Sequence, residues 1–470
     1  MTISSPVSDA PASPDAPASP GTIRARTGEV KLPSAFRLRT EMNGISEAPG
    51  KVWFWELAAS VIDADRCVQC GACIAACPTD SIGISNEDLP ELVKMCTGCS
   101  LCWDFCPRGG MRYESTWLRH EETPPTDVGP EPAVAPKGSE VVLSGSNDWR
   151  ITGADPAPDL GVVLEKVAAR VRRPSELDAA RVRRPGELDA PRAQDGGVVS
   201  AILLASLAAG EIDGAVVARE DPEHPWKGIP KLATTADEIR SAAGSFYNQT
   251  MALASLDLAA AGLRNDARVA VVGTPCEIQG IRALQARQWR RGSSRVDAVV
   301  LTIALLCTKS FDYRRLLLNE LRDGRGVELA EIGKIDVIHG RLLVEDRDGA
   351  TIVDEPIKDF HGAALKGCDE CADFLGRAAD ISVGSVGSDS GWSSVLVRTE
   401  AGSEAFKLAV PGLEVAELNH PEALERLDRL DKKIARSALQ RELDPDGPLF
   451  IDFAEHVTFY GGTDRAPVWK

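Results

Sequence analysis

Two runs of cysteine decide the fold of the N-terminal part: Cys67-Val-Gln-Cys70-Gly-Ala-Cys73-Ile-Ala-Ala-Cys77-Pro78 and Cys96-Thr-Gly-Cys99-Ser-Leu-Cys102-Trp-Asp-Phe-Cys106-Pro107. Both have the spacing Cys-x2-Cys-x2-Cys-x3-Cys-Pro, in which the fourth cysteine of each run ligates the cluster of the other run. The spacing predicts two [4Fe-4S] clusters, one on Cys67, Cys70, Cys73 and Cys106 and one on Cys96, Cys99, Cys102 and Cys77. We interpret this segment as a ferredoxin-like unit that moves single electrons.

Zinc and disulfides are the alternative uses of these cysteines. Disulfide frameworks belong to short exported domains, and this chain of 470 residues begins with neither a basic segment nor an apolar one. Zinc takes four ligands per ion, commonly as two separated pairs. Two complete four-cysteine runs, each closed by proline, favour iron–sulfur clusters instead.

Four further cysteines lie downstream, at Cys276, Cys307, Cys368 and Cys371. Thr274-Pro275-Cys276-Glu277 is typical of a helix start, with Thr274 as N-cap and Glu277 completing a capping box. We expect the helix dipole to lower the pKa of the Cys276 thiol. Cys307 follows a predicted strand, so both thiols lie where open α/β sheets bind ligands. A third cluster, a structural zinc ion and buried inert thiols all remain open from the spacing.

The composition restricts the class of protein. Hydrophobic residues make up 43% and charged residues 26% of the chain, which is typical of a globular protein. Acidic residues outnumber basic ones by 70 to 53, giving a net charge of -17, so we expect no nucleic-acid partner. No apolar run approaches the roughly 18 residues of a membrane span. We therefore expect a cytoplasmic protein without a membrane span.

Changes in composition and pattern predict five parts. Residues 1–58 are expected to form a disordered tail and lead-in, residues 59–114 the ferredoxin domain, and residues 115–190 a linker. The α/β domain is placed at residues 191–410 and a C-terminal helical extension at residues 411–470. The linker contains an 11-residue duplication, with residues 169–179 repeated at 180–190. Two copies are too few for a solenoid, so we interpret them as a tandem slip in a surface segment.

Alternating strand and helix patterns predict the second domain. Strands are expected at residues 214–218, 269–272, 296–306, 381–384 and 395–398, a β-meander at 335–356, and helices at 198–209, 236–243, 251–263, 275–288, 311–322 and 423–443. This order indicates a mixed α/β domain with a largely parallel sheet, and an α/β (α+β overall) class for the chain. Neither G-x-G-x-x-G nor G-x-x-x-x-G-K-[ST] is complete, so a flavin or nicotinamide would need another binding architecture.

Six motifs follow one another in this domain. They are AQDGGVV at residues 193–199, AGSFY at 243–247, GTPCEIQG at 273–280, CTKSF at 307–311, GCDECADF at 367–374 and DISVGSVG at 380–387. Together they resemble the family of coenzyme F420 hydrogenase/dehydrogenase beta subunits, in the form with an N-terminal two-cluster ferredoxin domain. The resemblance implies an α/β domain that binds FAD and one cubane, in which the flavin converts hydride chemistry with coenzyme F420 into one-electron transfer.

The resemblance also implies roles for particular residues. Cys276, Cys307, Cys368 and Cys371 would hold the third cluster. The flavin would be bound by Asp195, Gly196, Gly197, Ser245, Tyr247, Thr274, Gly384 and Gly387. The acidic tail of coenzyme F420 needs cations, for which Lys309, Lys366, Arg282 and Arg377 are candidates, and Lys309 is also the candidate catalytic side chain.

Three functions follow from this reading. The first is an iron–sulfur flavoprotein oxidoreductase that passes electrons between coenzyme F420 and ferredoxin or a partner redox subunit. The second is a ferredoxin-dependent reductase of an organic substrate of the tetrapyrrole type. The third is the electron-transfer beta subunit of a larger hydrogenase or dehydrogenase complex. Self-association of the chain is left open.

Overall fold

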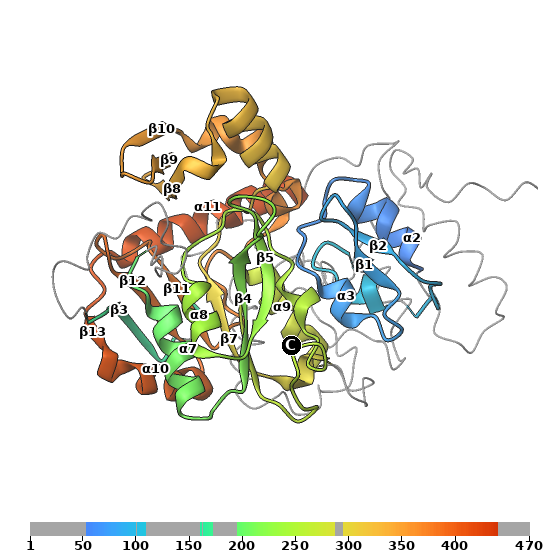
Figure 1. Ribbon diagram of the computed structural model, residues 1–470, viewed down its shortest axis with the longest axis horizontal. Helices are drawn as coiled ribbons and strands as arrows, with labels where there is room; N and C mark the ends of the chain where they lie inside the picture. Colours follow the sequence, from blue (N-terminus) through green and yellow to red (C-terminus); the bar gives the residue numbers. More distant parts are fainter. Residues whose placement is uncertain are drawn as a thin grey trace, which may run out of the picture.

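The computed structural model in Figure 1 describes residues 53–99, 101–109, 160–161, 163–172, 195–286 and 295–439. The ferredoxin-like unit (blue) lies beside a domain built on a large sheet, and a smaller sheet lies at the top of the view. Most of the expected tail, most of the expected linker and the second copy of the duplication lie outside the described residues. In the described part, no helix is both long and apolar enough to cross a membrane. The cytoplasmic location stays a prediction.

The large sheet is mixed. Its strand order is β13-β3-β12-β11-β7-β6-β4-β5. The four strands β4, β6, β7 and β11 are parallel to one another, and the strands flanking them are antiparallel. The bounds are β3 (Glu165–Val171), β4 (Gly214–Glu220), β5 (Gly228–Ala233), β6 (Val269–Gly273), β7 (Val299–Leu305), β11 (Ile381–Gly384), β12 (Ser393–Val397) and β13 (Leu413–Ala416). The largely parallel sheet expected from the sequence is therefore only its central part.

Alternating side chains place a hydrophobic core on each face of this sheet. On β4, Val216 packs into one core while Ala215 and Val217 pack into the other, as the two-residue period of a strand requires. Helices α7 (Val198–Ala208) and α10 (Glu400–Ala409) pack against each other on one face. Helix α9 (Pro275–Ala286) covers the other face together with η4 (Ala252–Ser255). A short helix, α8 (Ala236–Ser241), contacts α7.

Two strands of this sheet arise from segments assigned elsewhere by the sequence. Strand β3 lies within the expected linker and pairs with both β12 and β13, so residues 115–190 are not all linker. It was missed because only Ala168 and Ala169 are buried along it, which leaves almost no hydrophobic pattern. Strand β13 lies within the expected helical extension. The first residues of the duplication, from Ala169 to Val171, belong to β3, where Ala169 is buried and Val171 is exposed.

The helix expected over residues 251–263 is wrong. Met251 adopts a left-handed backbone, and only the single turn η4 follows it. Leu253 and Leu256 are fully buried beneath the sheet. Their spacing resembles a helical face, but tertiary packing rather than helix formation buries them.

The smaller sheet confirms the expected β-meander. Its antiparallel strands are β8 (Ile332–Ile338), β9 (Arg341–Asp346) and β10 (Thr351–Pro356), in the order β10-β9-β8. It shares a core with η6 (Arg314–Asp323) and η8 (Ile357–Ala363), in which Trp226 and Phe360 are buried. The larger domain also contains four short turns of 3-10 helix: η5 (Arg295–Ala298), η7 (Leu329–Glu331), η9 (Lys366–Glu370) and η10 (Val410–Gly412).

The ferredoxin-like unit consists of short elements around its cysteines. These are α2 (Phe54–Leu57), η1 (Ala58–Ile62), α3 (Ala72–Ala76), β1 (Ile82–Ile84), β2 (Pro90–Leu92) and α4 (Leu101–Asp104). The lead-in packs onto this unit, because Phe54, Leu57 and Val61 share a core with Trp103 and with three buried cysteines, Cys73, Cys102 and Cys106. Helix α3 contacts α9 and η4 of the larger domain. Gly71 has a φ of +77°, and a Cβ there would lie 2.9 Å from the Ala254 nitrogen, so the two units approach closely at this point.

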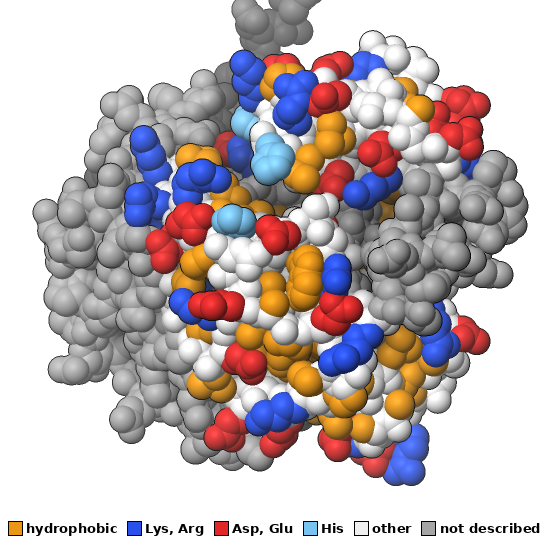
Figure 2. All heavy atoms as spheres, turned by 90° about the vertical axis from the view of Figure 1, so that its left-hand side faces the viewer, with side chains coloured by type: hydrophobic (Ala, Val, Ile, Leu, Met, Phe, Trp, Pro, Cys, Tyr) orange, Lys and Arg blue, Asp and Glu red, His pale blue; other side chains and the backbone are white. Residues whose placement is uncertain are grey.

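The last described helix, α11 (Pro421–Leu439), confirms the expected amphipathic helix over most of its length. It contacts η9, which carries a cysteine of the downstream quartet. Figure 2 shows the left-hand side of the molecule, where acidic and basic side chains alternate with hydrophobic ones. Among the described residues seen on this face, Lys and Arg side chains lie next to Asp and Glu side chains.

Candidate functional site

The first set of cysteines lies inside the ferredoxin-like unit, against the larger domain. Cys73 is on α3, and Cys106 follows α4. Burial raises the pKa of the Cys73 thiol well above its usual value, and the neighbouring thiolates of Cys67 and Cys106 raise it further. Burial likewise raises the pKa of Cys70, with contributions from Cys106 and Cys73. The structure thus brings together Cys67, Cys70, Cys73 and Cys106, the set that the spacing predicts.

The second set of cysteines lines a cavity. Cys77, Cys96, Cys99 and Cys102 all contribute to its wall, together with Thr79, Ser81 and Thr97. The backbone N–H of Ser81 donates to the Cys77 sulfur at 3.3 Å, and that of Gly98 donates to the Cys96 sulfur at 3.4 Å. Hydrogen bonds to ligand sulfurs stabilise negative charge and help to set the potential of a bound cluster.

The third set comes from three separate parts of the large domain. Cys276 lies in the first turn of α9, Cys307 follows β7, and Cys368 and Cys371 lie in and just after η9. Burial raises the pKa of Cys307 well above its usual value, and the thiolates of Cys368, Cys276 and Cys371 raise it further. The strand ends therefore gather these four thiols as the motif predicts.

The expectation for Cys276 is wrong in direction. Burial raises the pKa of its thiol well above the usual value, and Glu277 adds to the shift. The dipole of α9 cannot offset complete removal from water. Glu277 is itself buried, and its carboxylate accepts from the backbone N–H groups of Thr274 (2.7 Å) and Ala252 (2.8 Å), as half of the expected capping box. A multivalent cation is what could hold such buried thiols as thiolates.

The quartets follow one another in space. Cys70 belongs to the first quartet, and the thiolate of Cys276 in the third acts on its pKa. Cys77, from the first sequence run, lies instead in the wall of the second cavity. No three His, Cys, Asp or Glu side chains in the described ranges are placed to hold a single metal ion.

Two of the expected flavin residues lie at the start of α7. Gly197 has a φ of +69° and is the N-cap of α7. The Gly196 N–H donates to the Ser393 hydroxyl at 3.2 Å, and a Cβ at Gly196 would lie 2.5 Å from the Ala169 carbonyl oxygen. This N–H is therefore already hydrogen-bonded within the protein, and the small side chain serves close packing on β3 and β12.

Asp195 and Tyr247 meet a residue of the smaller sheet that no motif indicated. The Tyr247 hydroxyl donates to Asp336 at 3.2 Å and accepts from the Val337 N–H at 3.1 Å. Burial raises the pKa of Asp195 to about 6, and the Asp336 carboxylate adds to the shift while Lys334 opposes it. Tyr247 is thus hydrogen-bonded to β8, and Asp195, just before α7, lies near enough for the Asp336 carboxylate to act on its pKa.

Of the remaining flavin candidates, Thr274, Gly384 and Gly387 lie at or just after the ends of parallel strands. A Cβ at Gly384 would meet the Leu306 side chain, next to Cys307, and Gly387 approaches Ser394 on β12. The Thr274 hydroxyl accepts from the Gln249 amide at 3.0 Å and lies 3.1 Å from the Cys276 sulfur. Ser245 is half-buried. Thr274 directly follows β6 and Gly384 ends β11, so both lie at carboxyl ends of parallel strands, where open α/β sheets bind ligands.

Comparisons with known proteins agree with this arrangement. Residues 180–257 match the N-terminal domain, and residues 266–421 the C-terminal domain, of the coenzyme F420 hydrogenase/dehydrogenase beta subunit, while residues 60–112 match a 4Fe-4S dicluster domain. The chain is 35% identical to the coenzyme F420 hydrogenase subunit beta of Methanothermobacter thermautotrophicus over 46% of this chain and 75% of that protein. The chain belongs to this family of beta subunits. It is accordingly an oxidoreductase of the coenzyme F420 hydrogenase/dehydrogenase beta-subunit type, and it has an iron–sulfur domain.

Other relatives differ in how much they share with this chain. It is 28% identical to a subunit of the F(420)H(2) dehydrogenase of Methanosarcina mazei, over 79% of this chain and 90% of that one. It is also 28% identical to the coenzyme F420-dependent sulfite reductase of Methanocaldococcus jannaschii, but spans only 55% of that protein and 88% of itself. A chain of the F420-reducing [NiFe] hydrogenase complex from Methanosarcina barkeri superposes with a TM-score of 0.51 at 29% identity, over 59% of this chain and 91% of that one.

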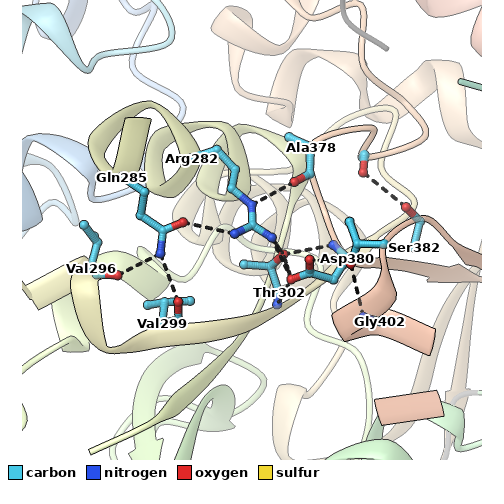
Figure 3. A network of polar contacts seen from close by, with 11 residues as sticks. Arg282, Gln285, Val296, Val299, Thr302, Ala378, Asp380, Ser382 and Gly402 are labelled. Carbon is cyan, nitrogen blue, oxygen red and sulfur yellow. Dashed lines mark hydrogen bonds and ion pairs between the residues drawn. The ribbon is translucent and has the colours of Figure 1, made fainter. Parts of the chain in front are cut away.

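Two of the four cations expected to bind coenzyme F420 have structural roles in this family member. Arg282 donates to Asp380 at 2.6 Å, to Thr302 and to the Ala378 carbonyl within the network in Figure 3. Arg377 pairs with Asp428 of α11 at 2.9 Å. All four of these charged side chains are at least 94% buried in the fold. Both guanidinium groups therefore stabilise the fold and are not placed to receive an acidic tail.

The other two cations lie nearer to the third quartet. Lys309 follows Cys307 and pairs with Asp369 at 2.6 Å, while Lys366 is exposed and pairs with Asp65 at 3.0 Å. Asp431 on α11 was missed by the sequence reasoning. It is buried near Lys309 and Cys307, and its Oδ2 accepts no hydrogen bond from the residues that the structure describes. Its only sequence signal was a place on an amphipathic helix.

Proposed function

We propose that the chain passes electrons between coenzyme F420 and ferredoxin or a partner redox subunit, through FAD and three [4Fe-4S] clusters. The observation that carries the proposal is the order of the three cysteine quartets. The second quartet opens into a cavity of the ferredoxin-like unit, the first adjoins the third, and the third lies at the carboxyl ends of β6 and β7. Such an order supplies a route from a flavin pocket to a docking partner.

The residues at the strand ends suit a flavin. A bound flavin would supply conversion between two-electron hydride transfer and one-electron transfer. We propose that the turn Gly384 to Gly387, the start of α7 and Thr274 border its pocket. Thr274 has one neighbour in the third quartet, at 3.1 Å. A flavin bordered by Thr274 would therefore lie next to that quartet.

Lys309 is the side chain that we propose for the substrate end of the route. It is 20% exposed, lies two residues after Cys307, and is held by Asp369. An ammonium group there would orient a phosphate or carboxylate of coenzyme F420. Lys366 is the second cation on this side, because Arg282 and Arg377 are committed to internal ion pairs.

The test is electron transfer by the anaerobic, cofactor-loaded full chain. Reduced coenzyme F420 should be oxidised with bleaching of the flavin, and ferredoxin should then be reduced. The Cys276→Ser variant should still bleach its flavin but should reduce ferredoxin far more slowly, while the control variant Ser403→Ala should behave as the wild type. Absence of deazaflavin oxidation by a fully loaded wild type would refute the proposal.

A second candidate function draws support from one observation. Two of the four cations expected for the acidic tail are internal, which is the pattern expected if the substrate were a less charged organic molecule of the tetrapyrrole type. Lys309→Glu together with Lys366→Glu separates the two. A large rise in the KM for coenzyme F420 supports the first function. An unchanged KM, with turnover of a tetrapyrrole by reduced ferredoxin, supports the second.

A further inference from the structure

Three charged side chains are buried where the ferredoxin-like unit meets the large domain. They are Arg66, Arg108 and Glu370, with exposed fractions of 8%, 2% and 8%. Arg66 immediately precedes Cys67, Arg108 follows Cys106 by two positions, and Glu370 immediately precedes Cys371. The first and third quartets therefore both adjoin this group of charges.

Hydrogen bonds fix the geometry of these charges. Arg66 donates to both carboxylate oxygens of Glu370, at 2.7 and 2.8 Å, so that these two charges form a bidentate pair. Arg66 also donates to the Arg108 carbonyl oxygen at 2.9 Å. The Arg108 guanidinium donates to two backbone carbonyl oxygens, those of Gly367 at 2.5 Å and Pro107 at 2.9 Å. Its positive charge is thus held by dipoles across the contact between the two units.

Arg108 lies beside both quartets. It follows Cys106 of the first quartet by two positions, and its guanidinium donates to the carbonyl oxygen of Gly367, which immediately precedes Cys368 of the third quartet. The ion pair between Arg66 and Glu370 makes a second link of the same kind, because Arg66 precedes Cys67 and Glu370 precedes Cys371.

We propose that Arg108 is a positioning residue whose single buried charge raises the reduction potentials of two adjacent clusters, those of the first and third quartets. The inference rests on the proposed function only in requiring clusters at these cysteines. A cluster becomes more negative by one charge on reduction, so a nearby cation stabilises its reduced form. Because the cation is removed from water, solvent and salt screen it little. One residue thereby favours electron transfer between the clusters of the two units and also links the units through its hydrogen bond to the Gly367 carbonyl.

The test is an anaerobic redox titration of the loaded full chain, followed by electron paramagnetic resonance. In Arg108→Gln, we expect the midpoint potentials of two clusters to fall by at least about 59 mV. This shift corresponds to a tenfold change in the one-electron equilibrium constant. The cluster of Cys77, Cys96, Cys99 and Cys102 should keep its potential and serves as an internal reference. Arg108→Lys should restore most of the shift, since it keeps the charge. The control is Arg264→Gln, at an arginine that is 84% exposed.

A second variant guards against loss of a cluster in Arg108→Gln. Glu370→Gln removes the carboxylate that neutralises Arg66, so the same two potentials should rise. The proposal is overturned if no potential moves in either variant, if all three clusters shift equally, or if the wild type lacks iron at the first or third quartet. Failure to oxidise coenzyme F420 with these shifts present would refute the proposed function and leave the role of Arg108 intact.

Discussion

The buried ion pair between Arg282 and Asp380 provides a quantitative test of the fold around the third quartet. Arg282 lies on α9, the helix whose first turn holds Cys276, and Asp380 precedes β11 (Figure 3). In Arg282→Met, Asp380 keeps hydrogen bonds from the Thr302 N–H and hydroxyl, both at 2.8 Å, and from the Thr399 hydroxyl at 2.7 Å. It loses the guanidinium, however, and remains a buried anion that is 99% removed from water.

Removing one partner of a buried pair costs about 3–5 kcal/mol, because the remaining charge is left uncompensated. Methionine keeps much of the apolar stem of arginine, so cavity formation adds little. The assay is denaturant unfolding of the loaded protein under anaerobic conditions, followed by circular dichroism. Asp380→Asn and the double variant complete the cycle, and the double variant should be more stable than the sum of the single effects predicts, by roughly 1–3 kcal/mol.

The matched control is Arg240→Met, which removes an exposed pair with Asp237 on α8. Exposed pairs contribute little, so its unfolding midpoint should equal that of the wild type. If Arg282→Met unfolds at the same midpoint as this control, or if the two single effects simply add, the network in Figure 3 does not stabilise the fold as argued.

Two further predictions concern the start of α7. Gly196→Ala should destabilise the chain by about 1–3 kcal/mol through overpacking, because the new methyl group would meet the Ala169 carbonyl. The control is Gly412→Ala, which should leave the stability unchanged because a Cβ there meets nothing within 4 Å. Equal unfolding midpoints for the two variants would contradict this. Asp195 titrates at about 6 in the fold, above its usual 3.8, so ionising it costs stability as the pH rises from 4 to 6. Asp195→Asn should therefore raise the thermal midpoint of the flavin-free chain at pH 7, and the midpoints of the variant and the wild type should converge at pH 4. A difference in midpoint that does not depend on pH would show that burial and Asp336 do not act on this carboxyl.

The quartets follow from local spacing in the sequence, whereas the sheet depends on pairing between distant segments. Cysteine spacing is a local constraint, since a thiolate two or three residues from the next can reach the same cage without knowledge of the rest of the fold. The exchange of Cys77 and Cys106 between the two clusters follows from the same spacing. The downstream quartet required the order of the motifs, because Cys276 and Cys307 meet only when β6 and β7 pair.

Long-range packing explains what the sequence did not predict. Strand β3 has few buried residues, and its place in the sheet depends on β12 and β13, which follow it by more than 200 positions. Arg282 and Arg377 carry no local mark that separates a ligand-binding cation from an internal ion pair. The same holds for Arg108, which lies next to a cysteine motif but acquires its role from the Gly367 carbonyl of another domain.

The account depends most directly on the iron, sulfide and zinc content of the anaerobically prepared chain. Three occupied quartets predict about twelve iron and twelve sulfide per chain, with four of each per cubane, and Cys307→Ser should lower both values by about one third. A content of eight iron that Cys307→Ser leaves unchanged would contradict a cluster on the third quartet. Zinc in place of iron would contradict the account as a whole.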